Sequence, residues 1–192
     1  MSNILIVGVG GQGSLLASRI LGAFYVGRGL DVKLSEVHGM SQRGGSVVTY
    51  VRAAQRVDSP IISAHTADMI LSFEALETAR YLDYLKPNGT IVTSTQEIDP
   101  MPVITGAVKY PKDILQQLSD AGVHVVGVDA LDLAVQAGSA KTANVVMIGA
   151  ASNILGGEES EWLSVLSECV PAKFLEMNQN AFRIGRTVRT AQ

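Results

Sequence analysis

The start of the chain carries the feature that most restricts its fold: a run of four apolar residues enters a cluster of glycines, and a helical pattern follows. The sequence from Ile4 to Ser14 reads ILIVGVGGQGS. Such an apolar run is typical of a parallel strand buried on both faces, and the apolar spacing over residues 13–28 predicts a helix. The spacing Gly8-x-Gly10-x-x-Gly13 matches the strand–turn–helix fingerprint of dinucleotide-binding folds.

This glycine turn is the first candidate for a binding site. We expect Gly8 to permit the turn, Gly10 to let a backbone or a ligand approach, and Gly13 to let the helix pack closely on the sheet. Gly11 and Gln12 complete the turn, and the N-terminus of the helix would attract an anion such as a phosphate. The alternative is a turn that serves packing alone or that docks the backbone of a partner.

A second loop, rich in glycine and polar residues, follows the strand expected over residues 31–37. The sequence of residues 36–47 is EVHGMSQRGGSV. An amide, a guanidinium and backbone amides come together there, which suits an anion or a carboxylate of another chain. The candidate binding residues of this loop are Ser41, Gln42, Arg43 and Gly44. The alternative is a solvated loop.

Two titratable residues lie at the beginning of that stretch. Glu36 lies about 20 residues beyond the glycine turn, where a dinucleotide-binding fold places the carboxylate that binds the ribose. His38 could act as a base or as a hydrogen-bond donor, and a purely structural histidine is the alternative. No catalytic residue is assigned, because neither a Gly-x-Ser-x-Gly nucleophile motif nor a phosphate-loop lysine is present.

The remainder of the chain alternates strands with helices. We expect strands over 47–52, 67–73, 90–95 and 123–128, and helices over 74–85, 111–121, 130–137, 143–155, 160–168 and from 171 onward. Residues 98–103 are expected to form a loop, and Asp129 and Ser160 are expected to be helix N-caps. The alternation predicts an α/β fold with a doubly wound, mostly parallel, Rossmann-like sheet and a helical C-terminal third, in a single domain spanning residues 1–192.

Composition narrows the classes of partner and cofactor. The net charge is −3 without a basic block, which argues against nucleic acid. The single cysteine, Cys169, excludes an internal disulfide, a cysteine-ligated iron–sulfur cluster and a Cys-rich zinc site within this chain, and we expect an idle thiol. His65 and His124 have no partner at metal-ligand spacing, so no metal site is expected. Neither a secretory signal nor a membrane span is expected, which favours the cytoplasm.

With these residues in view, the chain resembles the gamma-type domain of 2-oxoacid:ferredoxin oxidoreductases, and within that family the beta subunit of the indolepyruvate type. The motifs GVGGQG at 8–13 and EVHGMSQRGGSV at 36–47 carry the resemblance. Weaker support comes from Ala67-Asp68 ahead of Glu74-Ala75 and from Thr142-Ala143-Asn144. The resemblance extends over nearly the whole chain.

The resemblance implies an accessory subunit that supports oxidative decarboxylation of a 2-oxoacid to acyl-CoA, with electrons passed to ferredoxin. Thiamine diphosphate and the iron–sulfur clusters are then expected on the catalytic partner subunit, and coenzyme A as a co-substrate that this chain contacts. The isolated chain is expected to be inactive and could form a homodimer, because an apolar face made for a partner can pair with itself. The alternative is a stand-alone Rossmann-like protein that binds a nucleotide or coenzyme A.

Overall fold

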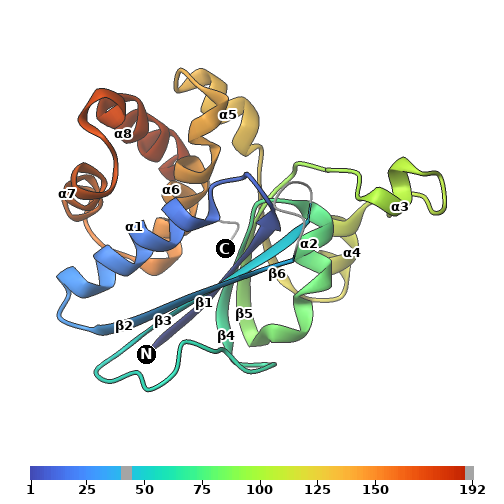
Figure 1. Ribbon diagram of the computed structural model, residues 1–192, viewed down its shortest axis with the longest axis horizontal. Helices are drawn as coiled ribbons and strands as arrows, with labels where there is room; N and C mark the ends of the chain where they lie inside the picture. Colours follow the sequence, from blue (N-terminus) through green and yellow to red (C-terminus); the bar gives the residue numbers. More distant parts are fainter. Residues whose placement is uncertain (40–44, 189–192) are drawn as a thin grey trace.

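The computed structural model describes residues 1–39 and 45–188 of the chain (Figure 1). One six-stranded sheet has the order β2-β3-β1-β4-β5-β6. The strands are β1 (Ser2–Val9), β2 (Asp31–His38), β3 (Ser46–Ala54), β4 (Ala67–Ser72), β5 (Leu85–Ser94) and β6 (His124–Val128). The helices are α1 (Ser14–Gly27), α2 (Ala75–Arg80), α3 (Met101–Ile104), α4 (Ile114–Asp120), α5 (Ala130–Gln136), α6 (Ala143–Leu155), α7 (Glu159–Cys169) and α8 (Ala172–Arg186), with 3-10 turns η1 (Leu82–Tyr84) and η2 (Ala140–Thr142).

Strand β1 lies inside the sheet and is buried on both faces. Successive side chains of a strand point to opposite faces, so Ile4 and Ile6 enter one apolar core while Leu5 and Val7 enter another. Helices α1 and α5–α8 gather over the first face, and α2 and α4 cover the second (Figure 1). The four-residue apolar run is therefore the centre of a three-layer α/β structure.

The sheet is mostly parallel, with one reversal. Strand β1 pairs in parallel with β4, β4 with β5, and β5 with β6. Strand β3 lies between β1 and β2 and is antiparallel to both. The expected β1–α1–β2 unit therefore exists, but its two strands are not neighbours, because β3 lies between them. Strands β2 and β3 form a hairpin, and the second glycine-rich loop connects them.

Helices α6 and α8 cross at very close range. A Cβ at Gly149 would lie 2.2 Å from the carbonyl oxygen of Phe182, and a Cβ at Gly185 would lie 2.1 Å from that of Val146. Only glycine permits such an approach of two backbones. The buried α6, predicted from its Ala- and Val-rich sequence, thereby joins the helical C-terminal third to the sheet.

The fold class is confirmed, as are helices α1, α5 and α6 and the N-cap of Asp129, whose side chain accepts a hydrogen bond from Asp132 N at 3.3 Å. The prediction that Ser160 is the N-cap of the next helix was wrong. Helix α7 begins after Glu158, whose backbone N donates to Glu161 Oε2 at 2.8 Å.

Several boundaries around β5 differ from the prediction. The helix expected over 74–85 ends at Arg80, and β5 begins at Leu85 with an irregularity that places Lys86–Gly89 opposite Asp68. The loop expected over 98–103 contains α3. Helix α4 begins at Ile114 rather than Pro111, because Asp113 has a φ of 54° and breaks the helical backbone.

Candidate functional site

The glycine turn is built differently from the expectation at two of its positions. Gly8 belongs to β1, and its lack of a side chain leaves room for Gln12, since a Cβ at Gly8 would lie 2.7 Å from Gln12 Oε1. The turn itself uses the left-handed backbone of Gly11 (φ 101°) and Gly13 (φ 85°). A Cβ at Gly13 would meet Asn144 Nδ2 at 2.4 Å, so Gly13 permits close packing against α6 rather than against the sheet.

The side chain of Gln12 fills the point where the chain changes direction across the sheet. From β1 the chain crosses to β2 over one face, and from β4 it crosses to β5 over the other. In open α/β sheets this switch point forms the crevice that receives a ligand. We call the space between the carboxyl ends of β1 and β4 the switch-point crevice.

Three hydrogen bonds hold Gln12 in the switch-point crevice. Its Oε1 accepts from Val9 N at 2.7 Å, and its Nε2 donates to the carbonyl oxygen of Phe73 at 2.8 Å and to Gln96 Oε1 at 3.1 Å. These contacts tie together the carboxyl ends of β1, β4 and β5. The Gln12 side chain therefore occupies part of the crevice in which open α/β sheets receive a ligand.

A cavity of about 270 Å³ lies beside Gln12, between the glycine turn and the N-termini of α5 and α6. Its polar lining comes from Gln12, Ser94, Gln96, Lys141 and Asn144, and its apolar lining includes Phe73, Leu131 and Met147. An ammonium group, the positive end of α6 and amide donors together favour an anionic group. Lys141 was not identified from the sequence, because no local sequence pattern indicates that a lysine in a turn lines a cavity formed by residues far away in the chain.

The glycine turn touches the second loop directly. Gly10 N donates to the carbonyl oxygen of Gly45 at 2.9 Å, so the backbone that approaches Gly10 is that of this chain itself. The four candidate residues of the second loop, Ser41, Gln42, Arg43 and Gly44, lie outside the described residues. The two candidate loops therefore meet just before the start of β3, while the assignment of those four residues stays a prediction.

Glu36 lies on the hairpin side of the turn, next to a cavity of about 200 Å³ that Gly10, Gly11 and Ser14 also line. Its Oε2 accepts from Ser14 Oγ at 3.0 Å and from Thr49 Oγ1 at 3.1 Å. Glu36 is thus placed where the fingerprint predicts an acidic residue, but one of its oxygens is already engaged. His38 is exposed at the end of β2.

Two buried carboxylates just beyond the end of β4 hold several hydrogen bonds, and they were not identified from the sequence. Glu74 is 1% exposed and caps α2, with Oε2 accepting from Glu77 N at 2.8 Å. Glu77 is 5% exposed and accepts from Ser46 Oγ at 2.5 Å, which anchors the first residue of β3. Burial raises the pKa of Glu77, against the lowering effects of the Ser46 hydrogen bond and of Arg80.

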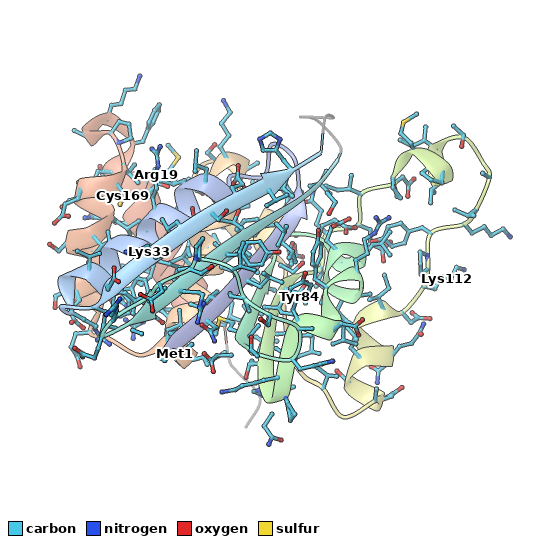
Figure 2. The ribbon with its side chains drawn as sticks, turned by 60° about the horizontal axis from the view of Figure 1, so that its bottom comes forward. Met1, Arg19, Lys33, Tyr84, Lys112 and Cys169 are labelled. Atoms are coloured by element: carbon cyan, nitrogen blue, oxygen red, sulfur yellow. The ribbon has the colours of Figure 1, made fainter. Side chains whose placement is uncertain are left out.

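The described residues hold neither a metal-binding cluster nor an activated thiol. Among residues 1–39 and 45–188, no group of three or more His, Cys, Asp or Glu side chains is placed to bind a metal ion. Cys169 lies near Arg19 (Figure 2), and burial raises the pKa of its thiol, which opposes a nucleophilic role. No helix in the same part of the chain is long and apolar enough to cross a membrane.

Comparison with known proteins decides the family. A family model described as pyruvate ferredoxin/flavodoxin oxidoreductase matches residues 3–188. The chain belongs to the pyruvate ferredoxin/flavodoxin oxidoreductase family. It is 42% identical over 190 residues to indolepyruvate oxidoreductase subunit IorB of Thermococcus kodakarensis, which covers 95% of this chain and 93% of that protein.

Solved structures share the fold of this family member. Pyruvate oxidoreductase subunit PORC of Thermotoga maritima superposes with a TM-score of 0.73 at 19% identity, covering 97% of this chain and 96% of that one. The 2-oxoglutarate:ferredoxin oxidoreductase of Magnetococcus marinus gives a TM-score of 0.68 at 19% identity, covering 100% of this chain but 32% of that one. The same fold thus occurs as a separate subunit and as one part of a longer chain.

Proposed function

We propose that this chain is the accessory subunit of a 2-oxoacid:ferredoxin oxidoreductase of the indolepyruvate type. The observation that carries the proposal is the 42% identity to the IorB subunit over nearly the full length of both chains. The enzyme would convert a 2-oxoacid and coenzyme A to an acyl-CoA and carbon dioxide, with two electrons passed to ferredoxin. An arylpyruvate is the substrate class that the identity favours.

The reacting cofactors belong to a catalytic partner subunit in this proposal. Thiamine diphosphate supplies the carbanion chemistry, and iron–sulfur clusters carry the electrons. With Cys169 as its single cysteine, this chain cannot supply the four thiolates of a typical cluster. Its contribution is instead a rim formed by the glycine turn, by Gly45 ahead of β3 and by the N-terminus of α6, which both contact that turn.

A contact with coenzyme A is the finer part of the proposal. The cavity beside Gln12 offers Lys141, the positive end of α6 and side-chain amides to a phosphate. The relative from Magnetococcus marinus was solved with 2-oxoglutarate, coenzyme A and succinyl-CoA bound, and this fold is one part of it. The hairpin-loop residues Ser41, Gln42, Arg43 and Gly44 stay predicted contributors to this contact.

The alternative function is a stand-alone nucleotide-binding protein. The spacing of Gly8, Gly10 and Gly13 and the position of Glu36 favour it. The contacts of Gln12 oppose it, because its side chain already occupies part of the switch-point crevice and is held there by three hydrogen bonds. Titration with NAD(H) and NADP(H) up to millimolar concentration is expected to give no saturable binding, and micromolar binding would favour the alternative.

The decisive test is reconstitution with the thiamine-bearing catalytic subunit of the same organism. Each subunit is purified separately, and CoA-dependent reduction of ferredoxin is measured with indolepyruvate, pyruvate and 2-oxoglutarate. We expect turnover from the mixture, greatest with indolepyruvate, and none from this chain alone. Turnover by this chain alone, or full activity of the catalytic subunit without it, would refute the proposal.

A further inference from the structure

The connection between β5 and α4 projects from the body of the protein. Residues 98–110, which we call the arm, carry α3 and stand away from the sheet and its covering helices in both views (Figures 1 and 2). Strand-to-helix connections in α/β units usually need two to six residues, and longer ones usually serve a function. The connection at residues 95–113 is far longer than the fold requires.

The tip of the arm is folded on itself. Ile104 N donates to the carbonyl oxygen of Pro100 at 3.1 Å, Thr105 N to that of Met101 at 2.9 Å, and Val108 N to that of Pro102 at 3.2 Å. Proline fixes the backbone φ at two of these positions. A preformed tip loses little conformational entropy when it binds, which favours affinity.

The tip presents apolar side chains to solvent. Met101, Ile104 and Val108 are 65%, 64% and 56% exposed, and they lie within eight residues of one another. Single exposed apolar residues are ordinary on protein surfaces, whereas a contiguous group marks an interaction site. Three strongly exposed apolar side chains on one short projecting segment favour a role in contact with a partner.

The two ends of the arm are fastened to one buried oxygen. Glu74 Oε1 accepts a hydrogen bond from Ile98 N at 3.1 Å and another from the hydroxyl of Tyr110 at 2.5 Å. The other oxygen caps α2, so this almost wholly buried carboxylate has three donors. Burying a carboxylate is costly unless such donors are supplied. This arrangement fixes the direction in which the arm leaves the body.

The root of the arm lies on the same rim as the glycine turn. Gln96, two residues before the arm, accepts from Gln12 Nε2 through its side chain and from Ala75 N, at 2.9 Å, through its carbonyl oxygen. The arm and the switch-point crevice therefore share one hydrogen-bonded base. A large subunit seated over the crevice would reach the arm as well.

We propose that the arm is a docking element that seats Met101, Ile104 and Val108 in an apolar groove of the catalytic subunit. The inference rests on the proposed function, because it takes the catalytic subunit as the occupant. Continuity of the arm with the rim of the crevice favours that subunit over a second copy of this chain. Glu74 and Tyr110 are positioning residues that hold the arm at the angle the groove requires.

The test measures binding of the holo catalytic subunit to immobilised chain by biolayer interferometry. The arm variant carries Met101→Ser, Ile104→Ser and Val108→Ser together, and the control carries Val26→Ser and Val135→Ser, both at positions 59% exposed but away from the arm. We expect the arm variant to raise Kd at least tenfold and the control to stay within twofold of wild type. Thermal unfolding of both variants should match wild type, because all five side chains are exposed.

Tyr110→Phe tests the positioning of the arm separately from the contact that its apolar tip makes with the catalytic subunit. It keeps the ring but removes the hydroxyl that donates to Glu74, and we expect a smaller rise in Kd, about threefold, with the apolar tip intact. Wild-type affinity in the arm variant would overturn the docking proposal while leaving the proposed function standing. Failure of wild-type chain to bind the catalytic subunit at all would instead refute the proposed function. A dimer of this chain that the arm variant dissociates, with unchanged affinity for the catalytic subunit, would also overturn the proposal.

Discussion

Replacing Gln12 by alanine tests whether this side chain holds the carboxyl edge of the sheet together. The substitution removes three hydrogen bonds and leaves Val9 N, the carbonyl oxygen of Phe73 and Gln96 Oε1 without that partner. Alanine keeps the backbone of the turn, because Gln12, unlike Gly11 and Gly13, does not have a positive φ. The perturbation is therefore confined to the crevice.

The expected cost follows from those contacts. A neutral hydrogen bond contributes a net of about 0.5–1.5 kcal/mol, so three contribute about 1.5–4.5 kcal/mol. Gln12 is half-buried, and water that enters the vacated space satisfies part of what is lost. We expect the free energy of unfolding to fall by about 2 kcal/mol, which at an m-value of about 2 kcal/mol/M lowers the urea midpoint by about 1 M.

Urea unfolding followed by fluorescence provides the measurement. Trp162 is the single tryptophan and is fully buried against Phe24, with ring centroids 3.7 Å apart, so its emission reports the folded core. Gln116→Ala is the matched control, because that exposed glutamine donates one surface hydrogen bond, to Asp120. A loss below about 0.5 kcal/mol for Gln12→Ala, within the range of ordinary surface substitutions, would show that the crevice is not held by this side chain.

Two further substitutions test the helix crossing and the buried carboxylate. Gly149→Ala should lower the free energy of unfolding by about 3 kcal/mol or more, because the new Cβ would lie 2.2 Å from a backbone oxygen. The control is Gly27→Ala, which has open space around it and should be neutral or stabilising by up to about 1 kcal/mol. Chemical denaturation measures both changes. Glu77→Gln should flatten the dependence of stability on pH. Burial raises the pKa of Glu77 above its ordinary value of 4.5, so its protonation stabilises the fold fully below pH 4.5 and that contribution is lost as pH rises through the folded pKa. The stability of the glutamine variant relative to wild type should therefore increase from pH 4 to pH 7 in urea titrations, and an unchanged difference would contradict the assignment.

Local sequence determined most of the fold because most of its elements bury apolar residues with a regular period. The run at Ile4–Val7 predicted a strand buried on both faces, and α6 was predicted with the bounds Ala143–Leu155 that the structure has. The short α3 escaped prediction because Pro100 and Pro102 resemble a loop, although proline is well tolerated in the first turn of a helix. The reversal of β3 has no local signature, since pairing direction is set by partners distant in sequence.

The glycine turn was predicted from its spacing, but the contacts that close it were not. The same spacing is compatible with a phosphate site and with a turn closed by its own glutamine. The deciding contacts, from Gln12 to Phe73 and Gln96, join residues about 60 and 84 positions apart. The hydrogen-bonding role of Glu74 was not predicted for the same reason: its partners Ile98 and Tyr110 are too far away in the sequence for a local pattern to indicate them.

The two long-range centres, Gln12 and Glu74, link the glycine turn to the base of the arm. Gly8 leaves the space that the Gln12 side chain occupies, and Gln12 in turn donates a hydrogen bond to Gln96, which lies two residues before the arm. A substitution in the glycine turn should therefore weaken docking of the arm as well as any contact made in the crevice. Coupling of that kind is measurable as a non-additive change in Kd when Gln12→Ala is combined with Tyr110→Phe, and strictly additive effects would show that the turn and the arm act independently.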